Sequence, residues 1–445
     1  MDIYSAKKKA NVLGNVVDII QMQSEVGAIA AVHGALQTGV LSSTFTSSQG
    51  LLLMLPNLYK LRGEMLPSVI YVASRSIASR SLSIFCDHQD IYATRITGVP
   101  IVSAASVQEI LDLAPAIHAS SLQASSPFIF FFDGFRTGHE TQKVEEYTQE
   151  MYNQFLNNDD LTKFRNRTMT PMDPDTRGTS EDESSFFQSI ESQNFQNQLI
   201  IDSVKEQFKK VEKLTGRHYA PFVYNGAKNP KYVMIIMGSA TEIAEETINN
   251  LNEKNDEYGV IKVHLYRPFS VKDFVNVLPK SVQKIVVLDR AKEWGANGEP
   301  LYLDTVATIN ENKDQFKKLD LIIGGRYGKN GIFLLNTQRT SQEIVEILPN
   351  RMKKQLADKN AKFYIIDAMK LSKEAGLGER MNTVIQMAFL YLISDEKKFN
   401  ESKQTLKDIV EKTYGKKGQD IVEANFKAMD LVSKENLLEI NVDPH

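Results

Sequence analysis

The sequence predicts an α/β protein built on doubly wound parallel sheets. In the first 140 residues, short runs of β-branched and aromatic residues alternate with segments of small residues that suit closely packed helices. The same alternation returns further along the chain, after a polar stretch. Short apolar runs of this kind are typical of parallel strands that helices cover on both faces.

The first region contains four predicted strands, which are Val16–Ile20, Val69–Ala73, Ile101–Ser103 and Phe128–Phe132. Polar residues follow three of these strands, where the chain turns away from the sheet. They are Glu25 after the first strand, Ser74 and Arg75 after the second, and Asp133, Gly134 and Arg136 after the last. Because ligands bind at the carboxyl ends of strands in open α/β sheets, these residues are candidates for one common site.

Glu25 is a lone carboxylate between the apolar run Val16–Ile20 and the segment VGAIAAVHGALQTGVL, which is almost all small or apolar. We therefore place it at a strand end and a helix start. An acid there either complements the helix dipole or faces a bound group, and position alone favours the first reading. For Arg75, the simplest reading of the residues alone is an ion pair with a nearby acid such as Asp87 or Asp90.

The composition turns polar from Asn157 to Gln198, around TPMDPDTRGTSEDESS, which predicts a long linker or excursion. We expect a first domain over residues 1–200, with the linker beginning at about 157, and a second domain over 201–330. The second domain has four predicted strands, Tyr232–Met237, Val260–Leu265, Lys284–Leu288 and Leu321–Ile323, and a helix over Thr241–Leu251 that Thr241 could cap. The turn WGANGEP lacks both common phosphate-loop patterns, so we read it as a structural loop.

A partial third α/β domain, mostly helical, is expected over residues 331–445. Its predicted elements are strands Ile332–Leu335 and Phe363–Ile366, a helix Ser341–Leu356 interrupted by Pro349, a buried helix Val384–Leu392, and an amphipathic helix Glu401–Tyr414 that stops at Gly415.

The composition argues against nucleic-acid binding and against a membrane span. The chain has 445 residues, of which 42% are hydrophobic and 24% charged, with a formal net charge of -3. The two signs are interspersed, so we expect no nucleic-acid partner. The longest apolar runs, such as Phe128–Phe132, are far shorter than the roughly 20 residues that a transmembrane helix needs, so no membrane span is predicted.

The single cysteine, Cys86, can neither form an internal disulfide nor supply the four thiolates of an iron–sulfur cluster. The seven histidines show neither H-x-x-x-H spacing nor His/Cys pairing at ligand spacing beyond what chance gives, so we expect no metal site. The N-terminus MDIYSAKKKANVLG has neither a secretory core nor a transit-peptide pattern, so a cytoplasmic location is the default. Mitochondrial, hydrogenosomal and cytoskeletal assemblies stay open.

Several long blocks resemble one family. The run QSEVGAIAAVHGALQTGVLSSTFTSSQGLLLMLPNLYKLRGEMLPSVIYVASRSIASRSLSIFCDHQD and the later FFDGFRTGHE resemble the N-terminal, pyrimidine-binding domain of pyruvate:ferredoxin (flavodoxin) oxidoreductase. LTGRHYAPFVYNGA, IKVHLYRPFS, VLDRAKEWGANGEPLYLD and IGGRYG resemble its transketolase C-terminal-like second domain. The part from FLLNT to KTYGKKG resembles the distal part of its third, 2-oxoacid oxidoreductase gamma-like domain. The fold implied is that of a thiamine-diphosphate enzyme, with two domains and a partial third.

The resemblance also implies a chemistry. The family decarboxylates pyruvate oxidatively with coenzyme A, thiamine diphosphate, magnesium and iron–sulfur clusters. Glu25 falls on the family's acid that protonates the aminopyrimidine ring, so it is both a catalytic and a cofactor-binding candidate. Arg75 falls on the arginine that holds the substrate carboxylate, a role that suits a bidentate fork. These assignments replace the interpretation of Glu25 as a partner of the helix dipole and of Arg75 as a member of an ion pair.

The sequence also departs from the family. The Y-P-I-T-P-S motif should precede Glu25 by more than the 24 residues present, and only Lys329–Ile332 joins IGGRYG to FLLNT, where the family has a large part of its third domain. The domain that binds the diphosphate and magnesium, with its G-D-G signature, is absent, and FDGF at Phe132 does not replace it. Cys86 stands where the family usually has glycine, and Ser79 with Arg80 where it has a threonine–histidine pair.

Two hypotheses follow. The first is a catalytically incomplete relative, a pseudoenzyme kept as a structural subunit of a larger assembly, possibly as a homodimer. The second is one subunit of a split 2-oxoacid (pyruvate):acceptor oxidoreductase, in which Glu25 and Arg75 work with partner chains. In both, no cofactor is expected on this chain alone, and thiamine diphosphate with magnesium binds only if a partner supplies the diphosphate domain. A weaker third reading is a sensor of a nucleotide or a 2-oxoacid.

Overall fold

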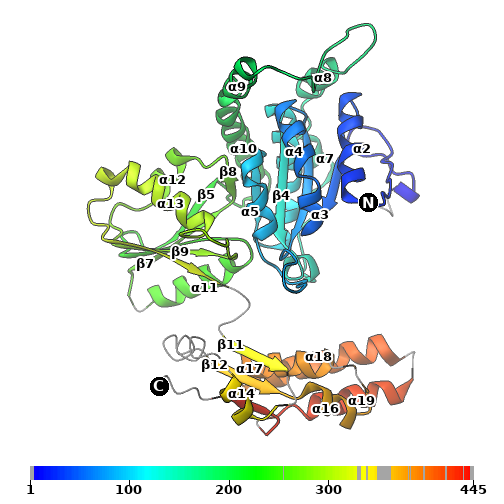
Figure 1. Cartoon of the computed structure of the whole chain (residues 1–445), viewed down its shortest axis with the longest axis vertical. Helices are drawn as coiled ribbons and strands as arrows, with labels where there is room; N and C mark the ends of the chain where they lie inside the picture. Colours follow the sequence, from blue (N-terminus) through cyan, green and yellow to red (C-terminus); the bar gives the residue numbers. More distant parts are fainter. Residues whose placement is uncertain are drawn as a thin grey trace. The chain divides into compact units, whose positions relative to one another are not determined.

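The computed structural model describes residues 5–253, 255–327, 332–336, 339–347, 362–378, 380, 382–393, 396–415, 418–433 and 435–440. The chain divides into two compact units, Met1–Tyr327 and Gly328–His445, and each is described by itself. Figure 1 shows the elements of each unit with their labels.

The first unit contains two five-stranded sheets. In sequence order, the strands of the first sheet are β1 (Ser43–Thr46), β2 (Ser68–Ser74), β3 (Ile101–Ala104), β4 (Pro127–Asp133) and β8 (Leu265–Arg267), and they lie in the order β1-β2-β4-β3-β8. All neighbours are parallel except β3 and β8, which are antiparallel. The predicted strands β2, β3 and β4 are confirmed.

The predicted buried strand Val16–Ile20 is wrong. Within this segment Val16 makes one isolated bridge to Ala10, and the side chains are exposed, with Ile20 at 75%. The first strand of the sheet is instead β1, whose sequence STFT gave little signal. A β-branched run forms a strand only where a neighbouring strand and a packing face are available, and Val16–Ile20 has neither among the described residues.

Alternate side chains of the first sheet point into two separate cores. On β4, Ile129 and Phe131 lie in one core, whereas Phe128 and Phe130 lie in the other. This alternation follows from the period of two in a strand, and all four side chains are fully buried. The sheet is therefore covered on both faces.

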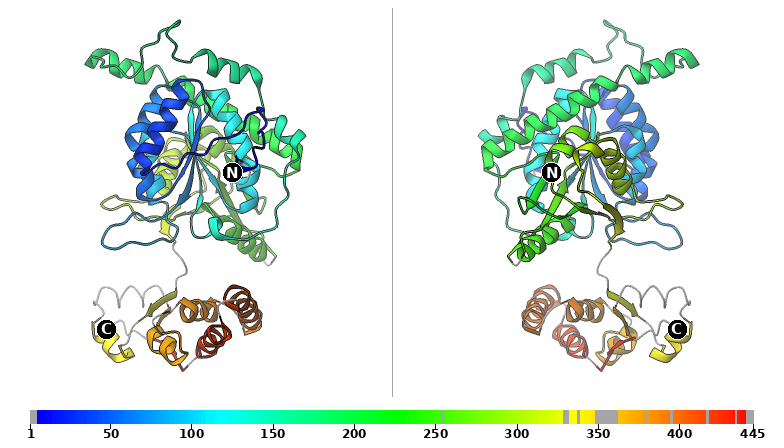
Figure 2. Two further views of the ribbon diagram at one scale, coloured as in Figure 1. Left: turned by 90° about the vertical axis from the view of Figure 1, so that its right-hand side faces the viewer. Right: turned by 90° about the vertical axis from the view of Figure 1, so that its left-hand side faces the viewer.

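Helices from different parts of the sequence cover these faces. The helices on the first core are α2 (Glu25–Gln37), α3 (Gln49–Leu53), α4 (Leu55–Gly63) and α5 (Gln89–Thr94). The second core is covered by α6 (Val107–Ala124) and α10 (Asn194–Thr215), which pack on each other. Figure 2 shows α2 and its neighbours in dark blue on one side of the sheet, and α10 in green on the other.

The polar stretch after residue 156 is partly helical. It forms α8 (Asn158–Asn166), α9 (Glu183–Glu191) and the first turns of α10, preceded by α7 (Gln149–Asn153). Leu161 and Phe164 of α8 are buried in the core that α2 covers. The stretch therefore packs partly on the first sheet.

The second sheet has the order β10-β9-β6-β7-β5. Its strands are β5 (Phe222–Gly226), β6 (Tyr232–Met237), β7 (Tyr258–Val263), β9 (Lys284–Asp289) and β10 (Leu321–Arg326), and its helices are α11 (Ala240–Asn252), α12 (Val271–Val277) and α13 (Pro300–Glu311). All neighbours are parallel except β5 and β7. The four predicted strands and the predicted helix at Thr241–Leu251 are confirmed, although Thr241 does not cap this helix, whose N-cap residue is Ser239.

The second unit carries a three-stranded sheet, β11 (Ile332–Asn336), β12 (Lys362–Ile366) and β13 (Leu437–Glu439). Its helices are α14 (Ser341–Ile347), α16 (Ala368–Glu374), α17 (Asn382–Ile393), α18 (Glu396–Tyr414) and α19 (Gln419–Asp430). Val384 and Met387 of α17 are fully buried, as predicted, and α18 ends at Tyr414. The remainder of the predicted helix Ser341–Leu356, with Pro349, lies outside the described residues.

The predicted fold class is confirmed, because both large sheets are mainly parallel and helices cover the first on both faces. No helix in the described ranges has the length and apolar character required to cross a bilayer.

Candidate functional site

Three parallel strands of the first sheet end at the same edge. Thr46 at the end of β1 pairs with Val72 of β2, and Ser74 at the end of β2 pairs with Asp133 at the end of β4. Residues that follow these strands therefore meet at one edge of the sheet. The predicted site residue Arg75 directly follows β2.

Glu25 is the first residue of α2, but it is not the cap of this helix. The N-cap is Ser24, whose Oγ accepts a hydrogen bond from the backbone N–H of Gly27 at 3.4 Å. The Glu25 side chain instead lies across the start of α3. A Cβ on Gly50 would come within 2.7 Å of Glu25 Oε1 and 2.6 Å of Thr46 Oγ1, so only a glycine leaves room for both side chains.

Buried polar atoms without partners occur on the segments that meet at this edge of the sheet. No hydrogen bond or ion pair to the Glu25 side chain occurs among the residues that the structure describes. Thr46 Oγ1, Gln49 Nε2 and Arg75 Nε are buried and likewise have no partner in the described part of the chain. Buried polar groups in proteins are almost always hydrogen-bonded, so a group of unpaired ones marks a place where a polar ligand fits.

The buried Asp90 connects the start of α3 with Arg75. Its Oδ2 accepts hydrogen bonds from the backbone N–H groups of Ser48 and Arg75, both at 2.9 Å. Its Oδ1 accepts from Ser74 Oγ at 3.0 Å and from the backbone N–H of Ile91 at 2.8 Å. Burial raises the pKa of Asp90 to about 6, and these four hydrogen bonds oppose the rise. Asp90 thus fixes the backbone on either side of the candidate site.

Ser48 has a φ of 53°, which is unusual for a residue other than glycine. Its Oγ donates to the carbonyl oxygen of Ser76 at 2.5 Å, which joins the turn before α3 to the segment after Arg75. Backbone strain of this kind persists where surrounding contacts hold it in place and is frequent at functional sites.

The Arg75 side chain does not pair with Asp87 or Asp90. Only its backbone N–H contacts Asp90, and no ion pair to its guanidinium occurs in the described ranges. Its Cγ packs against Gly134, where a Cβ would come within 2.9 Å. The ion pair expected from the residues alone is therefore absent here, and the guanidinium keeps an unpaired donor at Nε.

The structure places Glu25 and Arg75 on the same sheet edge, connected through Gly50, Ser48 and Asp90. Arg136, which also follows a strand of this edge, is instead a surface residue that pairs with Glu140 at 3.2 Å. The structure adds Thr46 and Gln49, which the sequence analysis did not select. Their signal was the segment FTSSQG, residues 45–50, which could have been read as a strand end followed by a helix start.

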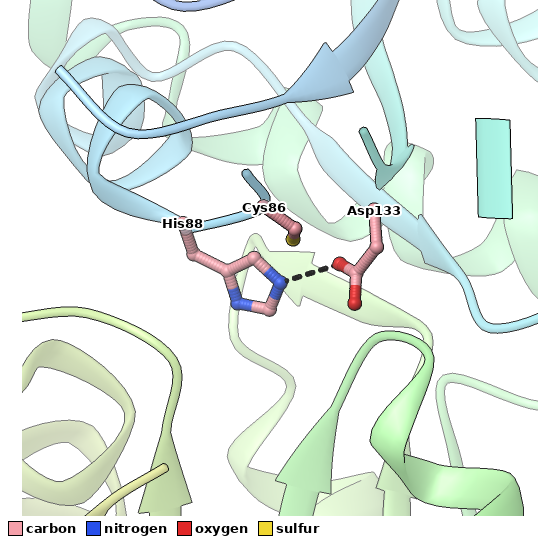
Figure 3. Close-up of side chains that lie close together, drawn as sticks. All are labelled: Cys86, His88 and Asp133. Atoms are coloured by element: carbon pink, nitrogen blue, oxygen red, sulfur yellow. Dashed lines mark hydrogen bonds and ion pairs between the residues drawn. The ribbon is translucent and has the colours of Figure 1, made fainter. Parts of the chain in front are cut away.

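A second polar cluster lies where the first sheet meets the second. Cys86, His88 and Asp133 offer one thiol, one imidazole and one carboxylate, and their ligand-type atoms all lie within 4.8 Å of one another (Figure 3). Asp133 Oδ1 lies 2.8 Å from His88 Nε2. Its Oδ2 accepts from Arg290 Nη1 at 2.6 Å and from the backbone N–H and Oγ of Ser239 at 3.0 and 2.5 Å.

Electrostatics in this cluster favour a charged carboxylate and a neutral thiol. Burial alone raises the pKa of Asp133, but the charge and hydrogen bond of His88, followed by Arg290 and Ser239, hold that pKa well below its usual range. Burial raises the pKa of Cys86 well above its ordinary value, and the charge of Asp133 raises it further. The sequence analysis missed this cluster, although the Cys86-x-His88 spacing was visible.

Comparisons with known proteins cover almost the whole chain. Residues 1–213 match the family described as "Pyruvate flavodoxin/ferredoxin oxidoreductase, thiamine diP-bdg", residues 230–329 match "Pyruvate:ferredoxin oxidoreductase core domain II", and residues 308–435 match "Pyruvate ferredoxin/flavodoxin oxidoreductase". The chain belongs to the pyruvate:ferredoxin oxidoreductase family. The predicted resemblance is confirmed.

Individual relatives agree with this membership. The pyruvate:ferredoxin oxidoreductase of Moorella thermoacetica is 35% identical over 570 residues, covering 96% of this chain and 48% of that protein. The probable pyruvate-flavodoxin oxidoreductase of Escherichia coli is 33% identical, covering 100% and 50%. The chain spans about half the length of these relatives. The 2-oxoglutarate:ferredoxin oxidoreductase from Magnetococcus marinus matches with a TM-score of 0.46 and 15% identity, over 70% of this chain and 55% of that one.

The residues at the first site fit the pyrimidine part of thiamine diphosphate. An aminopyrimidine offers ring nitrogens and an amino group. Glu25 and Thr46 offer a carboxylate and an unpaired hydroxyl on either side of Gly50, and the neighbouring Gln49 has an unpaired amide nitrogen. The diphosphate part, with its magnesium ion, has no matching site in the described residues. Their only close group of metal-ligating side chains is Cys86, His88 and Asp133, whereas magnesium takes oxygen ligands.

Proposed function

We propose that this chain is a catalytically incomplete pyruvate:ferredoxin oxidoreductase relative that works as a subunit of a larger assembly and retains the pyrimidine side of a thiamine-diphosphate site. A partner chain or domain supplies the side that binds the diphosphate and magnesium, and partners also supply the electron-transfer clusters. The oxidation of the substrate, with transfer of electrons to an acceptor, then takes place only in the assembly.

The observation that carries this proposal is the set of unpaired polar atoms on the sheet edge to which Glu25 belongs. Leaving a buried donor or acceptor without a partner costs about 1–3 kcal/mol for each group. Thr46 Oγ1, Gln49 Nε2 and Arg75 Nε are three such groups within the described residues. If the chain no longer bound a ligand here, substitution of these residues would remove the energetic cost of the unpaired groups without loss of binding. Their presence therefore favours a retained ligand.

Each residue then has a defined role. Glu25, at the positive end of the α2 dipole, holds and returns a proton at a pyrimidine ring nitrogen. When bound, the coenzyme supplies the carbanion that attacks a 2-keto group. Arg75, held by Asp90 through its backbone and by Gly134 along its side chain, presents its guanidinium to a substrate carboxylate.

A difference inside the aligned region supports the incompleteness. The alignment with the Moorella thermoacetica protein runs over 570 residues although this chain has 445, so the relative has many residues inside the aligned span that this chain lacks. This agrees with the short junction Lys329–Ile332, where the family has a large part of its third domain.

The alternative function is a purely structural subunit, a pseudoenzyme that no longer binds the coenzyme. Exposed apolar side chains favour this reading. Ile20 and Met22 precede α2 with 75% and 45% exposure, and Phe186 and Phe187 of α9 are 57% and 66% exposed. Exposed apolar groups of this size are frequent at protein interfaces.

Ligand-observed NMR on the full chain separates the two functions. Thiamine and thiamine diphosphate are tested with magnesium present, against the wild type and Glu25→Gln. The matched control is Glu183→Gln, because Glu183 is also an acid in the first turn of a helix, but its helix α9 has no buried residues. We expect both compounds to bind weakly and with similar strength, because the chain contacts only the pyrimidine.

Binding should be lost in Glu25→Gln and kept in Glu183→Gln. If neither compound binds the wild type, the retained half-site is wrong and the structural subunit is favoured. If both bind Glu25→Gln as well as the wild type, the role assigned to Glu25 is wrong.

A further inference from the structure

We propose that Cys86, His88 and Asp133 form a binding site for a divalent cation of the zinc type. The thiol sulfur, an imidazole nitrogen and a carboxylate oxygen lie within 4.8 Å of one another, and Figure 3 shows the three side chains directed toward a common point. Thiolate, imidazole and carboxylate are the three ligand types that zinc takes in proteins. Three protein ligands leave a fourth, tetrahedral position for water.

Local structure brings the three ligands together. Cys86 and His88 are two residues apart in the loop that enters α5, and His88 is the N-cap residue of that helix. Asp133 ends β4, the central strand of the first sheet. His88 and Asp133 are 1% and 0% exposed, so their positions are fixed by packing. The site therefore needs only small adjustments of side chains that are already ordered.

The atoms that a cation needs are available. Oδ2 of Asp133 is held by Ser239 and Arg290, whereas Oδ1 faces His88 Nε2 at 2.8 Å. A cation takes the place of the proton between these two atoms. Ser239 and Arg290 then orient the carboxylate from behind, as outer partners of metal ligands commonly do.

Binding of the cation requires Cys86 as a thiolate and a free electron pair on His88 Nε2, and any proton that either atom carries passes to solvent. The thiolate brings one negative charge to the cation. The Asp133 carboxylate brings a second, which it shares with Arg290 through the ion pair at Oδ2.

The ligand set of this site differs from that of the magnesium ion of the coenzyme. Magnesium takes oxygen ligands, whereas a soft thiolate and an imidazole select zinc or its close chemical relatives. The bound cation joins the loop after Arg75 to the end of β4. It also replaces the expectation that the chain has no metal site.

The test is a titration of the metal-free full chain with Co²⁺, which substitutes for zinc and reports its ligands by absorption. We expect one equivalent to bind, with a near-ultraviolet sulfur-to-cobalt charge-transfer band and the strong visible bands of tetrahedral cobalt. Zn²⁺ should remove both. Cys86→Ala should abolish the charge-transfer band and weaken Zn²⁺ binding at least tenfold, since it removes the one sulfur ligand.

Ser239→Ala should keep the band and weaken Zn²⁺ binding about 10- to 100-fold, because it removes only an outer hydrogen bond to Asp133. Circular dichroism of the metal-free variants checks that they are folded. If the folded wild type shows no charge-transfer band, or if Cys86→Ala binds Zn²⁺ as tightly as the wild type, the proposal is wrong.

Discussion

Nη1 of Arg290 lies 2.6 Å from Oδ2 of Asp133, and this buried ion pair connects the end of β9 in the second sheet to the end of β4 in the first. Asp133 is fully buried, so its charge depends on its partners. The next residue, Gly134, packs on Arg75. The second sheet thereby helps to position the residue that we assign to the substrate carboxylate.

Replacing Arg290 by Met should lower the free energy of unfolding of the first unit by about 3–5 kcal/mol, because it leaves the Asp133 carboxylate buried with one charge partner fewer. The matched control is Arg136→Met. Arg136 pairs with Glu140 at 3.2 Å, but its side chain is 53% exposed, so its loss should cost less than about 1 kcal/mol. Urea unfolding followed by circular dichroism measures both. Equal losses would mean that burial does not determine the strength of these pairs.

Replacing Gly50 by Ala should destabilise the chain by about 1–3 kcal/mol, because the new methyl group would meet Glu25 Oε1 at 2.7 Å and Thr46 Oγ1 at 2.6 Å. Gly34→Ala is the control, since Gly34 lies within α2 and a Cβ there meets nothing within 4 Å. That substitution should stabilise the helix by up to about 1 kcal/mol. Thermal unfolding gives both values, and a neutral Gly50→Ala would contradict the close contact of Glu25 with α3.

The ionisation of Asp90 should make its contribution to stability depend on pH. The folded pKa of about 6 lies above the ordinary value of 3.8, so the contribution is fully present below about pH 3.8 and lost as the pH rises through about 6. Asp90→Asn removes the ionisation. The loss of unfolding free energy caused by Asp90→Asn should therefore be smaller at pH 7 than at pH 4, by up to about 3 kcal/mol.

Unfolding free energies of the wild type and Asp90→Asn, measured at several pH values across this range, give the difference directly. A cost that is constant with pH would show that Asp90 titrates normally in the folded chain.

Tyr92 should contribute through a hydrogen bond to a buried acid. Its hydroxyl donates to Asp289 Oδ1 at 2.7 Å, and Asp289 is 1% exposed. Tyr92→Phe should cost about 1.5–3 kcal/mol, as expected for a bond to a charged group. Tyr71→Phe is the comparison, because the Tyr71 hydroxyl lies 3.0 Å from His118 in an exposed contact. It should cost less in the same unfolding assay, and a larger cost for Tyr71 would overturn this ranking.

The sequence predicted most of the interior strands because their composition alone identifies them. The run Phe128–Phe131 in β4 is buried whichever way its side chains point, since helices cover both faces of the sheet. The edge strands of the first sheet gave no such signal. β1 is a polar tetrapeptide at one edge, and β8 has three residues, so pairing with a neighbouring strand rather than composition determines both.

The candidate site was only partly predictable, for a similar reason. Glu25 and Arg75 could be named from the resemblance, although the strand expected before Glu25 does not exist. The unpaired state of Thr46 and Gln49, and the meeting of Cys86 with Asp133, depend on contacts between distant segments. Local patterns contain no information about such contacts.

The strand β8 belongs by sequence to the second predicted domain, yet it completes the first sheet. It pairs with β3, whose four residues are all buried, and the backbone N–H of Ser103 donates to the carbonyl oxygen of His264 at 2.7 Å. A recombinant fragment that stops before residue 265 would expose the unpaired edge of β3 to solvent and promote aggregation. The two halves of the first unit should therefore be expressed and purified as one piece.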